Sequence, residues 1–80
     1  MMTKEKIQEL IASQLALSHI EVRGDDGQHF EAVVVSPDFE GLSTVKQHQM
    51  VYQTLGERMQ TNEIHALALK TMTPSEWEGA

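Results

Sequence analysis

The chain has no cysteine among its 80 residues. Without a thiol it can form no disulfide framework, no thiolate nucleophile, and no zinc ribbon or iron-sulfur cage from its own side chains. Any chemistry with a soft metal would therefore need sulfur from a partner.

Long apolar runs and an excess of basic charge are also missing. The apolar runs are far shorter than the roughly 18 to 20 residues that cross a bilayer. The opening segment, MMTKEKIQELIASQ, is charged and amphipathic, unlike a signal peptide. We therefore expect a cytoplasmic protein with no membrane association.

Acidic residues outnumber basic ones, since twelve Asp and Glu against six Lys and Arg give a formal charge of -6. Such a surface repels phosphate on average, so nucleic-acid binding would require a strong local basic patch. The six cations are scattered along the chain, which disfavours such a patch.

The composition that remains fits one domain over residues 1–80, with 40% apolar and 22% charged residues. The chain contains no glycine-rich phosphate loop, no GxSxG and no HExxH. A chain this short also leaves little room for a deep substrate pocket. We expect a protein that is not an enzyme.

The first half of the chain predicts a helix and a hairpin. Thr3 can cap a helix that runs to about Leu17, with apolar residues at three- and four-residue spacing on one face. Residues 20–23 and 30–35 show strand patterns, and Phe30, Ala32 and Val34 share one face of the second strand. Because Gly24-Asp25-Asp26-Gly27 is typical of a turn, the two strands should form an antiparallel hairpin.

The second half predicts a helix, a strand and a short helix. Ser43 can cap a helix that ends near Thr61-Asn62, whose buried stripe would comprise Val45, Val51, Leu55 and Met59. Residues 64–70 form the third strand, with His65 on the face of Leu67 and Leu69. Both of its faces are apolar, which indicates an interior strand.

The sequence Thr73-Pro74-Ser75-Glu76 is a capping box with proline at the first helical position, and it directs Trp77 back toward the body. The order αββαβ followed by a short helix predicts an α+β fold of two layers. Helices would cover one face of a three-stranded sheet.

Histidine is the main candidate for chemistry, at positions 19, 29, 48 and 65, but no two of the four have the short spacing of a metal site. His19 is expected to be solvent-exposed, His48 packed or half-exposed, and His29 exposed at the end of the hairpin loop. His65 would reach either water or a partner, or else be satisfied by backbone at the sheet end. Its pairing with His29 requires the hairpin loop to lie beside the entry of the third strand.

Two segments, FEGLSTVKQHQMVYQTL and IHALALKTMTPSEWEG, resemble the BolA family of small cytoplasmic proteins, and within it the short acidic bacterial type. The resemblance covers about Ile7 to Glu78, and the combination of F-x-G, H-x-M-V-Y, I-H-A-L and T-P-x-E-W is specific. It implies a fold similar to the class II KH domain, with a short terminal helix.

The resemblance also implies a non-enzymatic adaptor that pairs with a monothiol glutaredoxin and shares a bridging 2Fe-2S cluster, in cluster assembly, trafficking or iron sensing. The glutaredoxin side supplies a cysteine and a glutathione thiolate, while the isolated BolA side carries no cofactor and is a monomer or weak homodimer. The family's histidine ligand corresponds to His65. For the second ligand we favour His29, with the Asp26 carboxylate, near the place of a cysteine in many relatives, or no ligand at all as alternatives. Nitrogen in place of thiolate raises the potential of a cluster.

An alternative also comes from the resemblance, because some members look like DNA-binding transcriptional regulators of stress response or cell morphology. That interpretation depends on an Arg-His-Arg run in the second helix, where this chain has Gln47-His48-Gln49. Lys46 and His48 remain as its candidate contacts. Gly24 to Gly27 matches a KH GXXG loop in letters only, because its two aspartates would repel phosphate.

Overall fold

The computed structural model describes residues 1–79, and it has the predicted α+β order in two layers. Its elements are α1 (Lys4–Ala12), β1 (His19–Arg23), β2 (His29–Val35), the 3-10 turn η1 (Pro37–Phe39), α2 (Thr44–Thr54), β3 (Ala66–Met72) and α3 (Pro74–Glu78). Across residues 1–79, no helix has the length and apolar character needed to cross a bilayer.

The sheet has the strand order β1-β2-β3. β1 pairs with β2 in antiparallel fashion, which confirms the hairpin, and β3 runs parallel to β2 after the α2 crossover. The prediction of β3 as an interior strand is wrong, because β2 is central and β3 lies at an edge. Ala66 and Ala68 give the outer face of β3 an apolar sequence, yet Ala68 is exposed on this edge strand.

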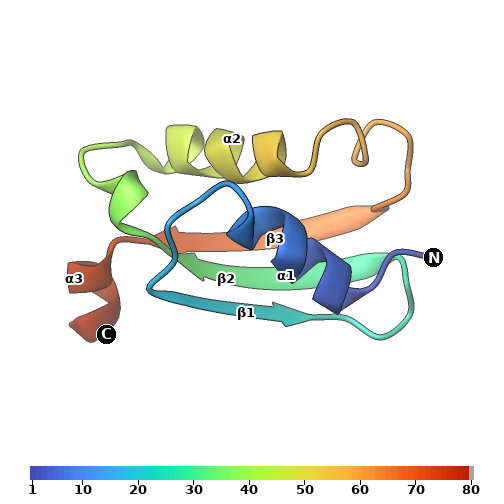
Figure 1. Ribbon diagram of the computed structural model, residues 1–80, viewed down its shortest axis with the longest axis horizontal. Coiled ribbons are helices and arrows are strands. Elements are labelled where there is room, and N and C mark those ends of the chain that lie inside the picture. The colour runs from blue at the N-terminus through green and yellow to red at the C-terminus, as the bar shows by residue number, and fades with distance from the viewer. Residues whose placement is uncertain (80) are drawn as a thin grey trace.

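The core lies between the sheet and the two longer helices (Figure 1), with α1 against β1 and α2 against β3. Phe30, Ala32 and Val34 line the covered face of β2, as predicted from their alternation. α1 contributes the fully buried Ile7 and Ile11 to this core, and α2 contributes Val51, followed by the fully buried C-cap residue Leu55. The covered face is therefore continuous across all three strands.

α1 ends at Ala12 and not near Leu17. The hydroxyl of Ser13 donates to the Leu10 carbonyl at 2.7 Å, so a side chain satisfies an acceptor at the helix end. Beyond it, Asp38 Oδ2 accepts the Ala16 N–H at 3.0 Å and holds the chain in a turn. Leu15 stays buried, which explains why its spacing suggested a longer helix.

α2 is also shorter than predicted, ending at Thr54, and Gly56 follows with a φ of +62°. A left-handed glycine is the usual way for a helix to stop. The predicted stripe was wrong at Val45, which is 66% exposed, while Gln47 is buried. Gln47, Val51 and Leu55 carry the buried face at four-residue spacing.

Three caps expected from the sequence are present. The Thr3 and Ser43 hydroxyls accept the N–H groups of Lys6 and Lys46, at 3.1 and 3.3 Å. At α3, Thr73 Oγ1 accepts the Glu76 N–H, and Glu76 Oε1 accepts the Thr73 N–H. The capping box is therefore formed on both sides.

Candidate metal centre

The β1–β2 turn lies beside the entry of β3, at the end of the molecule where the N-terminus also lies (Figure 1). The Ala66 N–H donates to the Gln28 carbonyl at 2.9 Å, and His29 is the register partner of Ala66. His65 immediately precedes β3, so the sheet brings it next to His29. Their ring centroids are 5.3 Å apart, with 81° between the ring planes.

Both imidazoles of this histidine pair face solvent. The His29 side chain is 62% exposed, and His65 is also exposed. Within residues 1–79, neither ring nitrogen of His65 has a hydrogen-bond partner. The predicted strand was wrong here, because β3 starts at Ala66 and leaves His65 outside the sheet. His65 therefore reaches water, and backbone at the sheet end does not satisfy it.

Asp26 organises the loop that carries His29. Its Oδ1 accepts the backbone N–H groups of Gln28 and His29, both at 2.8 Å. Its Oδ2 lies 2.8 Å from Nδ1 of the His29 ring. These contacts, led by the backbone N–H of His29 and followed by its side chain and the N–H of Gln28, hold the pKa of Asp26 well below its ordinary value.

The contact with Asp26 defines the tautomer of His29. An ionised carboxylate can only accept, so Nδ1 of a neutral His29 must carry the proton and donate it to Oδ2. Nε2 then has a bare lone pair. A histidine whose second nitrogen donates to a carboxylate is the usual arrangement of a metal ligand.

Gly24 fixes the start of the turn. It has a φ of +147°, and a Cβ at this position would lie 2.5 Å from Phe30 Cδ1 and 2.6 Å from the His29 carbonyl oxygen. Only glycine allows both the conformation and the close approach. The Gly-Asp-Asp-Gly segment is thus a hairpin turn, as the sequence indicated, and its first glycine places His29 at the start of β2.

The histidine pair offers two nitrogen ligands and no more. Among residues 1–79, no group of three His, Cys, Asp or Glu side chains is arranged to hold a metal ion. Imidazole nitrogen suits iron, zinc, copper and nickel. The pair can therefore supply two nitrogen ligands to a metal.

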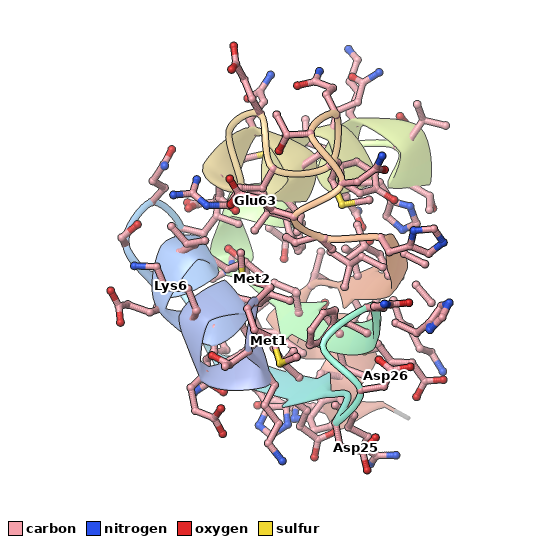
Figure 2. The ribbon with its side chains drawn as sticks, turned by 90° about the vertical axis from the view of Figure 1, so that its right-hand side faces the viewer. Met1, Met2, Lys6, Asp25, Asp26 and Glu63 are labelled. Carbon is pink, nitrogen blue, oxygen red and sulfur yellow. The ribbon has the colours of Figure 1, made fainter. Side chains whose placement is uncertain are left out.

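A surface hollow of about 460 Å³ adjoins this centre on the Asp26 side. Figure 2 looks onto this end of the molecule and shows Met1 between α1 and the turn that carries Asp26. Residues of the N-terminus, the hairpin turn and the α2–β3 connection share its lining, among them Met1, Met2, Lys6, Asp26, Asn62 and Glu63. The hollow thus lies beside the turn that carries the histidine pair's Asp26 contact.

The alternative nucleic-acid residues lie on α2. Lys46 is exposed and His48 is half-buried, as expected for His48. Gln47 between them points into the protein, where its Nε2 donates to the Leu42 carbonyl at 2.9 Å and its Oε1 accepts from Thr71 Oγ1 at 2.7 Å. One of the three positions in the Gln-His-Gln run is thus unavailable to a ligand.

His19 was expected to be solvent-exposed, and that prediction was wrong. Its side chain is 34% exposed and stacks on Trp77, with ring centroids 4.5 Å apart. His19 Nε2 lies 3.5 Å from Glu21 Oε1 without forming a hydrogen bond. The capping box had indicated that Trp77 turns back toward the body, but nothing in the sequence identified its contact.

The family model described as BolA-like protein matches residues 5–76. The acid stress protein IbaG of Escherichia coli K12 is 41% identical over 76 residues, which cover 95% of this chain and 89% of the relative. The DNA-binding transcriptional regulator BolA of the same organism is 36% identical over 88 aligned positions, covering 99% of this chain and 83% of the relative.

A solved structure supports the same assignment through the fold. The BolA protein homologue from Coxiella burnetii superposes with a TM-score of 0.83 at 47% identity, covering 98% of this chain and 99% of that one. The resemblance seen in the sequence motifs thus extends over the whole αββαβ framework. This chain belongs to the BolA family.

Proposed function

We propose that the protein is a non-enzymatic cytoplasmic adaptor that pairs with a monothiol glutaredoxin and co-ligates a bridging 2Fe-2S cluster in cluster assembly, trafficking or iron sensing. The observation that carries this proposal is the exposed pair of His29 and His65, which no third metal-binding side chain joins among residues 1–79. The sulfur ligands would come from the glutaredoxin cysteine and from glutathione.

His65 and His29 would bind one iron through neutral imidazole nitrogens. Two nitrogen ligands on one iron raise the potential of a 2Fe-2S cluster relative to an all-thiolate site. Asp26 is the weaker candidate for the second ligand, because both of its oxygens already accept hydrogen bonds from the loop. This geometry supports His29 over Asp26 and over a site with a single histidine.

The cluster hypothesis is tested by spectroscopy. The purified protein alone should be colourless, and adding a cluster-loaded monothiol glutaredoxin with glutathione should change the visible absorption and circular dichroism. His65→Ala should remove most of that change. His48→Ala is the matched control, because it deletes an imidazole from α2, and it should behave like the wild type. An unaltered spectral change in His65→Ala would disprove the ligand assignment.

A KH-like DNA-binding regulator is the second candidate. The name of one Escherichia coli relative, the DNA-binding transcriptional regulator BolA, favours it. Lys46 and His48 would be its contacts. The buried Gln47 and the formal charge of -6 weigh against it. Sequence-specific retention on DNA at physiological salt, which Lys46→Ala reduces, would support this function. Retention that disappears at physiological salt would count against it.

A further inference from the structure

The two histidines of the pair differ in how they are held. The His29 ring is bound through Nδ1 to Asp26, whereas within residues 1–79 no hydrogen bond orients the His65 ring. Asp26 is itself fixed, because its other oxygen accepts two backbone N–H groups at 2.8 Å. The Asp26 carboxylate thus links the His29 ring to the backbone N–H groups of Gln28 and His29 within the turn.

Building on the proposed function, we infer that Asp26 is the positioning residue for His29: it holds the proton on Nδ1 and thereby presents Nε2 as the nitrogen that binds metal. The carboxylate acts through the imidazole and does not touch the metal. The Asp26 carboxylate excludes the tautomer with the proton on Nε2, which would leave no lone pair on the ring nitrogen that Asp26 does not contact.

One conservative substitution, Asp26→Asn, should reverse this tautomer. In Asp26→Asn, the amide oxygen can replace Oδ1 and keep both backbone N–H groups, which preserves the turn. The amide nitrogen then takes the place of Oδ2 and directs a donor at Nδ1 of His29. Nδ1 must become the acceptor, and the proton of the neutral ring moves to Nε2.

Asp25→Asn is the matched control. It removes one negative charge from the same turn, as Asp26→Asn does, but Asp25 makes no hydrogen bond to His29. Any difference between the two variants therefore reports the contact with the ring and not the net charge. Asp26→Ala serves as a third variant, because it removes the acceptor without adding a donor.

The test reads the tautomer directly, in the protein without metal. Long-range proton–nitrogen NMR correlations on uniformly ¹⁵N-labelled protein, recorded under alkaline conditions where imidazole is neutral, distinguish protonated from bare ring nitrogens. We expect the wild type and Asp25→Asn to carry the His29 proton on Nδ1, and Asp26→Asn to carry it on Nε2. Asp26→Ala should shift toward the Nε2–H form that a free imidazole in water prefers.

The same variants are then mixed with cluster-loaded glutaredoxin. Loss of a carboxylate that orients a ligand histidine typically weakens metal binding by about 10- to 100-fold, so the midpoint of the spectral titration should move by that order in Asp26→Asn and stay unchanged in Asp25→Asn. A wild-type His29 protonated on Nε2, or a tautomer identical in all four proteins, would overturn the inference. A separate outcome would contradict the proposed function: no spectral change when the wild-type protein is mixed with the loaded glutaredoxin, whichever His29 tautomer NMR shows.

Discussion

The rings of His19 and Trp77 stack with their centroids 4.5 Å apart and only 16° between their planes. His19 begins β1 and alternates with Ile20, which packs on the core, so this contact lies on the sheet face opposite α1 and α2. Val35, the register partner of His19, is fully buried on that same face. The terminal helix thus closes one corner of a face that is otherwise open.

The stack predicts that Trp77→Ala will destabilise the protein. A stacked aromatic pair contributes about 0.5 to 1.5 kcal/mol beyond the area it buries, so the free energy of unfolding should fall by about 1 to 2 kcal/mol. Urea denaturation followed by far-ultraviolet circular dichroism measures the change. Trp77→Phe retains a ring for His19 and should lose less. An equal loss in the two variants would show that the stack contributes nothing.

The capping box at α3 predicts a second loss of stability. Thr73→Ala removes the acceptor for the Glu76 N–H and should lower the free energy of unfolding by about 1 kcal/mol. Glu76→Gln keeps a side-chain acceptor for the Thr73 N–H and should be close to neutral. Both are measured by chemical denaturation, and an unchanged midpoint in Thr73→Ala would mean that the cap does not stabilise the helix.

Gln47 joins α2 to the loop before it and to β3, through Leu42 and Thr71. Gln47→Ala would leave the Leu42 carbonyl without this donor and Thr71 without its acceptor. We expect a loss of about 1 to 3 kcal/mol in the free energy of unfolding, measured by denaturant. The exposed neighbour Gln49 is the control, since Gln49→Ala should stay within about 0.5 kcal/mol of the wild type.

The element order and the caps could be predicted because they depend on local chemistry. The amino-acid sequence alone indicates the alternation of buried and exposed positions in residues 30–35. It also shows the capping donors and acceptors of Thr73 and Glu76. The predictions failed where contacts between distant parts of the chain determine which side chain is buried. Val45 matches a helical stripe as well as Gln47 does, yet the glutamine is buried because Leu42 and Thr71 offer it partners.

The candidate site could be predicted only in part. Residue patterns left His65 undecided between solvent and an internal partner, and the resemblance to a family singled it out. Its approach to His29 depends on the parallel pairing of β2 with β3, which no local pattern encodes. The role of Asp26 was missed, although an aspartate three residues before a histidine in a turn is a signal that could have indicated it.

Asp26 also predicts a dependence of stability on pH. Its pKa is lower in the folded protein than in the unfolded chain, so on acidification the unfolded state takes up the proton first. The contribution is complete above the ordinary aspartate pKa of about 4 and is lost as the pH falls further. The stability difference between wild type and Asp26→Ala, from urea titrations at several pH values, should therefore shrink below about pH 4. A stability difference that stays constant as the pH falls would contradict this prediction.

Gly24 gives the sharpest prediction about the turn. Gly24→Ala would combine an unfavourable φ with contacts of 2.5 Å to Phe30 and 2.6 Å to the His29 carbonyl, so the hairpin must shift. Gly41 is the control, because it also has a positive φ, of +76°, but a Cβ there meets nothing within 4 Å. Gly41→Ala should lose about 1 kcal/mol from backbone strain alone. Gly24→Ala should lose at least twice that in urea denaturation, and it should also displace the His29 and His65 ring signals in NMR spectra. Equal losses in the two variants, with undisturbed histidine signals, would mean that the turn does not position the histidine pair.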